Sequence, residues 1–337
     1  MLEVTNNDNL AAAKAYAAVG CLSQTAPFAN VEFNVQNNSN MSGYAATNSA
    51  RFATDGSVTF AAGSETFEIT AEGKMQSSAA PVTSIRVNSA AQLKEALAST
   101  TLETIYLAPG TYDEVYYHNN GTKKIASGNP ENKAVISGKF VAQSDVVFEN
   151  VDFTPSAKSL TDLSTSTYGS KVNGSYHSIV TISYAVASFE GCSFSGLNTT
   201  YQASAINYFT ESSGKVLKVN NCSFEGIAKA IYSKVLFEVT NSHFDLEDGV
   251  AIYVWPRATG EGQAVFTGNE NAHANSMIAI GCLTQSGNYA NMTFNVQGNT
   301  GTIRPYAAVN SARFDAATIT FADGSETFAI SAEGKML

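Results

Sequence analysis

The sequence predicts an all-β chain whose short strands wind into a solenoid of stacked parallel coils. Only 14% of its 337 residues are charged and 44% are apolar, which suits stacked repeats better than a charge-coated globule. A long block of sequence occurs twice, once near each end. Between the two copies, one short pattern recurs: VVFENVDF (146–153), ASFEGCSF (187–194), LKVNNCSF (217–224) and FEVTNSHF (237–244).

Each recurrence combines an alternating strand, an Asn or Gly, and a short strand that ends in Phe. The spacing varies from 20 to 41 residues, because loops of different length intervene. In a parallel coil, equivalent side chains stack along the axis, so we expect an internal ladder of Phe153, Phe194, Phe224 and Phe244. A left-handed backbone conformation is tolerated at the corner by Asn150, Gly191, Asn221 and Asn241.

The duplicated block aligns residues 18–75 with residues 279–336 at an offset of 261 or 262. More than half of the aligned positions are identical, which excludes chance. The two copies share GCL at 20 and 281, FNVQ at 33 and 294, NSARF at 48 and 310, and GSETF at 63 and 324. Within the first copy, VEFNV, SVTF and ETFEI alternate apolar and polar residues and predict strands of four or five residues.

A short helix is expected at residues 89–99, after a strand around Ile85 and Val87. Ser89 and Gln92 have capping-box spacing, and the apolar stripe consists of Leu93, Ala96 and Leu97. The order AAQLKEAL, TIYLAPGTYDE, AVISGKFVAQSDVVFENVDF resembles the N-terminal part of the pectin lyase-like superfamily over roughly residues 82–250. This resemblance implies a right-handed parallel β-helix with a capping helix. It indicates the fold rather than an activity.

The resemblance also implies a domain organisation. Residues 1–75 would be a three-coil block that closes a preceding copy, residues 76–81 (QSSAAP) a link, and residues 82–337 a module with its own C-terminal block, 264–337. The alternative is one continuous solenoid. Only Leu337 follows Met336, and strand-like sequence begins at residue 2, so we expect uncapped coils at both ends. Such ends would join chains end to end.

The charge of the chain excludes two classes of partner. A formal net charge of −10 and an isoelectric point near 4.9 do not suit nucleic acid or an anionic membrane. The sequence contains no run of eighteen apolar residues, which a membrane-spanning helix would need. Its first residues lack the features of a signal peptide. The resemblance implies an extracellular or cell-surface location, although this chain carries no signal peptide.

No catalytic residues are predicted. Pectate lyases of the superfamily use an acidic calcium cluster with an Arg or Lys base, and pectin methylesterases use paired Asp, Arg and Gln, usually with a QD element. The sequence has no QD dipeptide, no Asp pair in coil register and no GxSxG elbow. We therefore expect neither an enzyme nor a resident cofactor.

Three groups of polar residues have a structural interpretation with a functional alternative. The acidic turn of Asp245, Glu247 and Asp248, near Arg257, is read as a solvated turn, with a calcium site as the alternative. His243 is expected to be a paired strand residue, and His118, His177 and His273 have no metal-ligand spacing. Cys192 and Cys222 occupy equivalent positions and are expected to be stacked thiols, with a disulfide left open.

Aromatic residues give the clearest functional indication. Glycans are commonly held by exposed aromatic rings with amide and hydroxyl partners, so loops 154–178 and 196–216 could line a glycan groove. Tyr112, Tyr116 and Tyr117 are expected near the start of the coils, and the glycan-binding candidates are Tyr168, Tyr176, Tyr201, Tyr253 and Trp255.

Three functions follow from these observations. The leading hypothesis is a non-catalytic surface or filament protein that assembles with itself and binds polysaccharide or host glycan. The alternatives are a polysaccharide lyase or esterase, and a trimeric receptor binder similar to a phage tailspike.

Overall fold

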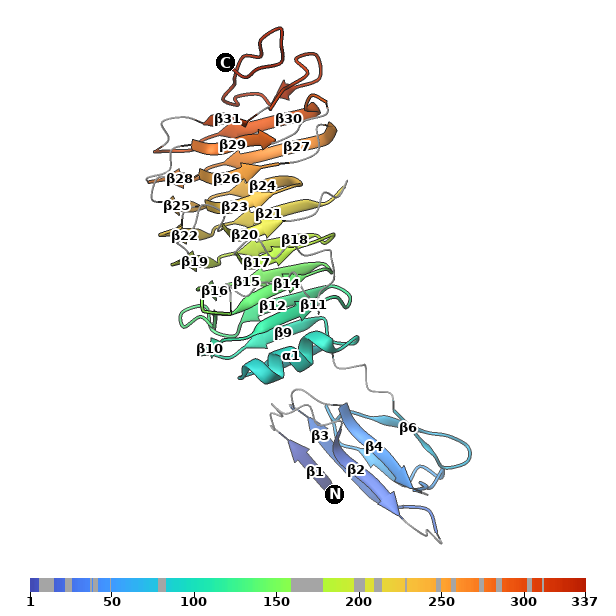
Figure 1. The fold of residues 1–337 in the computed structure, drawn as a ribbon. Coiled ribbons are helices and arrows are strands. Elements are labelled where there is room, and N and C mark those ends of the chain that lie inside the picture. Colours follow the sequence, from blue (N-terminus) through green and yellow to red (C-terminus); the bar gives the residue numbers. More distant parts are fainter. Residues whose placement is uncertain are drawn as a thin grey trace. The chain divides into compact units, whose positions relative to one another are not determined.

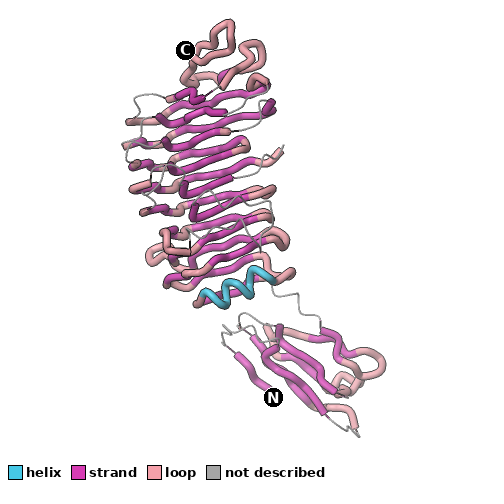
Figure 2. The backbone as a smooth tube through the Cα atoms, viewed as in Figure 1, coloured by secondary structure: helices cyan, strands magenta, loops and turns pink. Residues whose placement is uncertain are grey.

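Strands dominate the protein (Figure 2), and α1 (Ala90–Ala98) is the helix of its described part. The computed structural model describes residues 1–5, 15–21, 26–36, 38, 42–48, 50–77, 83–158, 178–196, 204–208, 214–227, 229–246, 250–255, 259–272, 276–282, 287–301, 305–310 and 312–337. The chain divides into two units: Met1–Val87 with Thr101–Ile105, and Asn88–Thr100 with Tyr106–Leu337.

Three long parallel sheets run along the coils, to which successive turns of the chain add strands (Figure 1). The ten-stranded sheet has the order β32 (Thr320–Phe321), β30 (Ala290–Gln297), β27 (Thr259–Thr267), β24 (Leu236–Thr240), β21 (Val216–Asn220), β18 (Ala187–Glu190), β15 (Val146–Glu149), β12 (Lys123–Ser127), β9 (Thr104–Leu107), β8 (Ser84–Val87). The seven-stranded sheet has the order β10 (Thr111–Tyr112), β13 (Val135–Ile136), β16 (Asp152–Phe153), β19 (Ser193–Ser195), β22 (Ser223–Glu225), β25 (His243–Asp245), β28 (Glu270–Asn271).

The third sheet has eight strands. Its order is β11 (Val115–His118), β14 (Lys139–Ala142), β17 (Ser178–Ile182), β20 (Ser204–Tyr208), β23 (Lys229–Ser233), β26 (Val250–Val254), β29 (Ser276–Cys282), β31 (Tyr306–Asn310). Three parallel sheets that share a core are the architecture of a parallel β-helix, so the predicted fold class is confirmed.

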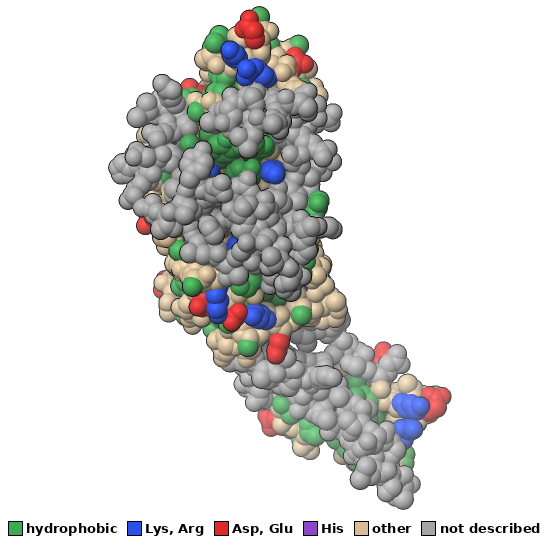
Figure 3. Space-filling model, in the orientation of Figure 1, with side chains coloured by type: hydrophobic (Ala, Val, Ile, Leu, Met, Phe, Trp, Pro, Cys, Tyr) green, Lys and Arg blue, Asp and Glu red, His purple; other side chains and the backbone are tan. Residues whose placement is uncertain are grey.

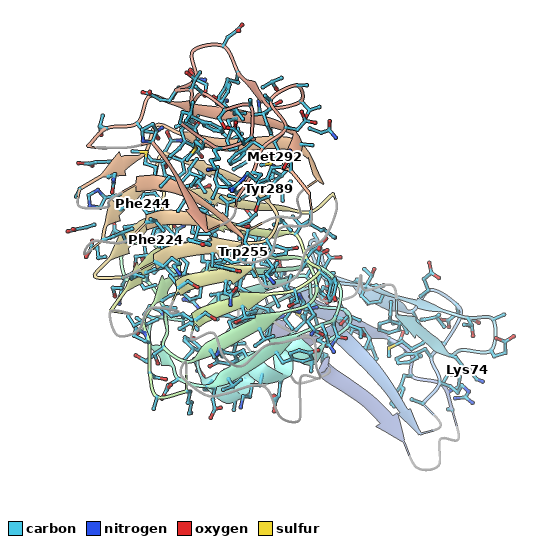
Figure 4. All side chains as sticks on the ribbon, turned by 45° about the horizontal axis from the view of Figure 1, so that its top comes forward. Lys74, Phe224, Phe244, Trp255, Tyr289 and Met292 are labelled. Carbon is cyan, nitrogen blue, oxygen red and sulfur yellow. The ribbon has the colours of Figure 1, made fainter. Side chains whose placement is uncertain are left out.

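The predicted Phe ladder lies inside the coils. Ring centroids are 4.7 Å apart for Phe153 and Phe194, 4.8 Å for Phe194 and Phe224, and 4.9 Å for Phe224 and Phe244. The last two rings are labelled in Figure 4, and all four side chains are fully buried. The ladder spacing equals the spacing of hydrogen-bonded strands, so each ring packs flat on its neighbour one coil away.

The predicted corner is also confirmed. Asn150, Gly191, Asn221 and Asn241 have φ values of 54°, 61°, 51° and 49°, in the left-handed region. Gly268 and Gly298 continue this ladder, each with a φ of 65°. A turn of this kind lets the chain pass from the ten-stranded to the seven-stranded sheet within two residues.

Helix α1 begins as the capping-box pattern predicts. The Ser89 side chain accepts a hydrogen bond from the Gln92 N–H, and the Gln92 side chain accepts one from the Asn88 N–H. Leu93, Ala96 and Leu97 form its buried stripe. The helix therefore has one apolar face, as a capping helix requires.

The first unit contains short sheets of the same kind. Its parallel sheets have the orders β1 (Leu2–Thr5), β3 (Val31–Gln36), β5 (Val58–Phe60), and β2 (Ala15–Cys21), β4 (Ser42–Asn48). An antiparallel pair, β6 (Phe67–Ile69) and β7 (Met75–Ser77), follows them. The core consists of Phe33, Val35, Phe52, Val58 and Phe67.

The two duplicated blocks have the same backbone pairing. Strand β1 pairs with β3 as β27 pairs with β30, with Leu2 opposite Phe33 and Ala264 opposite Phe294. The bridge between Phe28 and Phe52 has its equivalent in Tyr289 and Phe314. Identical sequence thus forms identical local structure in each unit.

The expectation of an uncapped last coil is not met in either block. Residues 61–77 and 322–337, here called the closing segments, hydrogen-bond to the last long strand of their block. The Glu65 N–H donates to the Val35 carbonyl at 2.7 Å, and the Glu326 N–H donates to the Val296 carbonyl at 2.7 Å. The N–H groups of Val35 and Val296 donate to Ser64 Oγ and Ser325 Oγ, both at 2.9 Å. The shared GSETF sequence is therefore part of a cap.

A phenylalanine of each closing segment also covers the end of the core. Phe67 contacts the rings of Phe33, Phe52 and Phe60, with centroids 5.0 to 5.3 Å apart. Phe328 contacts four rings in the same manner: Phe294, Tyr306, Phe314 and Phe321. Among the described residues, no helix is long and apolar enough to span a membrane.

Candidate functional site

The outer face of the eight-stranded sheet carries an unusual row of side chains. Its inner face contains a fully buried apolar row, with Val180, Ile206, Ile231 and Ile252 in register. Successive residues of a strand point to opposite faces, so the next residue of each strand points outward. The outward row contains Tyr117, Val141, Thr181, Asn207, Tyr232, Tyr253, Ala279 and Ala307.

Three aromatic rings form what we call the aromatic strip: Tyr232, Tyr253 and Trp255. The Tyr232 and Tyr253 rings lie 5.7 Å apart and within 7° of parallel. Trp255, labelled in Figure 4, lies 5.7 Å from Tyr253 at 29° and 6.4 Å from Tyr232. Tyr253 and Trp255 are half-buried. The strip therefore spans two neighbouring coils and presents ring surface at Tyr253 and Trp255, whereas Tyr232 is buried.

A lysine lies beside the strip. Lys229 Nζ is 4.9 Å from the centre of the Tyr253 ring, which is within range of a cation–π interaction. Burial lowers the pKa of the Lys229 ammonium, because a desolvated charge is disfavoured. Lys229 is itself half-buried.

Polar side chains lie on the same outer face of the eight-stranded sheet, on the strands between the strip and α1. Asn207 is opposite Tyr232 in the sheet and only 1% exposed. Its Oδ1 has no hydrogen-bond partner within the part of the chain that the structure describes. Gln143 follows β14, and its Oε1 accepts a hydrogen bond from the Tyr117 hydroxyl. Its Nε2 is buried and has no hydrogen-bond partner among the described residues. Thr181 shares a hydrogen bond of 2.7 Å with Ser178.

The structure brings together two of the five glycan-binding candidates, Tyr253 and Trp255. Tyr168, Tyr176 and Tyr201 lie outside the described residues. Sequence reasoning missed Tyr232, Lys229 and Asn207. A signal for Tyr232 was present, since KAIYSK (229–234) and VAIYVW (250–255) match when they are aligned on their Ile and Tyr.

Of the acidic turn, the structure describes Asp245. Asp245 pairs in register with Glu225, and its carbonyl accepts a hydrogen bond from the Gly226 N–H at 3.0 Å. Glu247, Asp248 and Arg257 lie outside the described residues. In the described ranges no group of three His, Cys, Asp or Glu residues could hold a metal ion.

The histidines and cysteines whose side chains the structure describes are either paired or buried. His243 lies 3.2 Å from a carboxylate oxygen of Glu270, and His118 is buried in the core. His177 and His273 lie outside the described residues. Cys192 and Cys222 are buried free thiols, and burial raises the pKa of the Cys222 thiol.

A charged cluster near α1 is satisfied within the protein. Figure 3 shows basic and acidic side chains together at that end of the second unit. Glu114 accepts hydrogen bonds from Lys94 at 2.7 Å and Lys158 at 2.9 Å, and these lower its pKa to about 2. The cluster joins three segments of the chain and leaves the aromatic strip as the stronger candidate site.

Comparison with known proteins identifies no family. No protein-family model matches the sequence, and no curated protein matches it either. One similar solved structure is a variant of the PL6 family alginate lyase AlyGC, with 10% identity and a TM-score of 0.34. The match covers 94% of this chain and 57% of that lyase, so this chain spans little more than half of its length. A likeness this distant says nothing about activity.

Proposed function

We propose that this chain is a non-catalytic β-helix protein of a cell surface that binds glycans on the aromatic strip. The observation that supports this proposal is the stack of Tyr232, Tyr253 and Trp255 on an outer sheet face. Sugar rings have apolar C–H faces that pack on aromatic rings, and their hydroxyls bond to nearby amides. A rigid sheet holds the rings at fixed spacing, so little ordering is needed on binding.

Affinity electrophoresis in gels that contain one polysaccharide tests the proposal. We expect retardation of the full chain in at least one gel from a panel of neutral and acidic polysaccharides. Trp255→Ala should lose that retardation. Tyr106→Ala is the matched control, since Tyr106 is 43% exposed on the ten-stranded sheet, away from the strip. No retardation in any gel, or equal loss in both variants, would refute glycan binding at the strip.

The enzymatic alternative predicts a different result. A lyase or esterase would release unsaturated products, new reducing ends or free alcohol from the retained polysaccharide. We expect no release with or without calcium. Release that disappears in Asp245→Asn would reverse the order of the two functions.

Self-assembly is part of the proposal in a revised form. Among the described residues, β1 pairs with β3 alone and β2 with β4 alone, whereas their equivalents β27 and β29 have β24 and β26 as further neighbours. This supports β1 and β2, rather than the closing segments, as the edges that another coil would join. Light scattering after gel filtration tests the association and also distinguishes the trimer expected of a tailspike-like protein.

A further inference from the structure

Asn207 combines two properties that rarely occur together in a protein interior. It is 1% exposed, and its Oδ1 accepts no hydrogen bond from any described residue. Buried amide oxygens almost always accept a hydrogen bond inside the protein, because burial removes their hydrogen bonds to water and leaving them unpaired is costly. An unpaired acceptor beside a binding surface is therefore a position where a ligand group can supply the missing donor.

The position of Asn207 relates it directly to the aromatic strip. Asn207, Tyr232 and Tyr253 occupy one register row on three successive strands of the eight-stranded sheet. Neighbouring strands lie about 4.8 Å apart, so the amide is one strand from the first ring. The unpaired oxygen therefore lies next to the buried side of the strip.

Exposure changes along this row. Asn207 is 1% exposed and Tyr232 7%, whereas Tyr253 and Trp255 are half-buried. The accessible part of the row is therefore at Tyr253, beside Trp255. A ligand that enters there places its innermost sugar toward Tyr232 and Asn207.

The chemistry of the amide oxygen limits which group of a ligand can bind it. Oδ1 is an acceptor only, so its partner must be a hydroxyl or an N–H group. The carboxylate of an acidic sugar is an acceptor only at neutral pH, so such a sugar could donate to Oδ1 only through one of its hydroxyls. The net charge of −10 disfavours a polyanion.

We infer, resting on the proposed function, that the strip takes the end of a neutral glycan, whose innermost sugar donates a hydroxyl hydrogen bond to Asn207 Oδ1. Tyr253 and Trp255 hold the next sugar by stacking. The Lys229 ammonium lies over the Tyr253 ring, and neither of the two sugar contacts uses it.

The test uses the full chain and measures two quantities for each variant. The first is binding to a neutral glucan, a neutral galactomannan, polygalacturonate and alginate. The second is the midpoint of urea unfolding. Asn207→Leu replaces the amide by an apolar side chain of similar size, and Lys229→Met removes the charge beside the strip. Tyr106→Ala again serves as the control.

We expect the wild type to bind a neutral polysaccharide more tightly than either acidic one. Asn207→Leu should weaken that binding about tenfold, the usual effect of one lost buried hydrogen bond. Its unfolding midpoint should be unchanged or higher, because an unpaired acceptor has been removed. Lys229→Met should keep neutral binding within about threefold, as expected when no charged ligand group is lost.

Three results would overturn this inference. Preferential binding of the acidic polysaccharides, lost in Lys229→Met, would assign a different ligand class and leave glycan binding itself intact. Unchanged neutral binding in Asn207→Leu would remove the hydroxyl contact. A lower unfolding midpoint in Asn207→Leu would show that the amide has a partner inside the protein. Failure to bind any polysaccharide would instead refute the proposed function.

Discussion

The rings of Phe194 and Phe224 lie 4.8 Å apart and within 3° of parallel, one coil above the other. Both side chains are fully buried, so the stack is part of the core. We expect Phe224→Ala to destabilise the protein by about 3–5 kcal/mol, because it leaves a cavity between two rings. Urea unfolding measures this. A loss below about 1 kcal/mol would contradict a continuous packed ladder.

The left-handed corner gives a prediction about backbone conformation. Asn221 has a φ of 51°. Asn221→Ala should cost about 1–2 kcal/mol, because a Cβ group is disfavoured in this region, whereas Asn221→Gly should cost clearly less. The comparison of the two unfolding midpoints is the measurement. Equal effects of Ala and Gly would mean that the side chain rather than the backbone determines stability at this corner.

The closing segment at 322–337 should keep the last coil from associating. A Cβ on Gly334 would lie 2.7 Å from the Phe314 carbonyl oxygen, and the φ of Gly334 is +75°. Gly334→Ala should therefore loosen the segment and expose the edge of β30, which favours self-association. Light scattering over a range of concentrations should detect larger particles than for the wild type.

The control for this experiment is Gly214→Ala. Gly214 has a similar φ of +73°, but a Cβ there would meet no atom within 4 Å. This variant carries the backbone strain without the clash. If both variants associate equally, or neither differs from the wild type, the closing segment is not the cause.

His118 predicts a pH dependence of stability. Burial lowers the pKa of this imidazole below its usual value of 6.5, with a smaller contribution from the Lys123 charge. In the interval between the lowered pKa and 6.5, the unfolded chain binds the proton and the folded chain does not. The stability that depends on this group is thus complete above pH 6.5 and is lost as the pH falls.

Urea unfolding at several pH values between 7.5 and about 5 measures this effect. We expect the slope of stability against pH to be smaller in His118→Leu than in the wild type, whatever the stability of the variant at pH 7.5. Equal slopes would show that His118 is not a source of the acid sensitivity.

The sequence allowed the β-helix, the Phe ladder, the left-handed corners and the cap of α1 to be predicted. Each of these features repeats at equivalent positions or has a local chemical signature, as the φ values of Asn221 and Asn241 show. ETFEI does form a strand in the first unit, β6 (Phe67–Ile69), but its alternation did not show that the closing segments hydrogen-bond to the last long strand of their block. Alternation in the sequence does not reveal whether Phe67 and Phe328 continue a stack of core rings or cover its end. That depends on the reversal of the chain at Gly73 and Gly334.

The candidate site could be predicted only in part. Tyr253 and Trp255 were identified as aromatic residues with a polar neighbourhood. Tyr232, one coil away, was missed, because the number of residues per coil varies and pairing in register is a property of the three-dimensional structure. The unpaired oxygen of Asn207 could not be inferred at all, since hydrogen-bond partners are known only once the strands are placed.

The most direct test of the account uses the intrinsic fluorescence of the chain. Trp255 is its one tryptophan and belongs to the aromatic strip, so its emission reports on that surface alone. Titration with the neutral polysaccharide that the protein binds should give a saturable change in emission. The affinity obtained from this titration should be about tenfold lower in Asn207→Leu. Binding that saturates in electrophoresis without any change in Trp255 emission would place the glycan elsewhere and contradict the account.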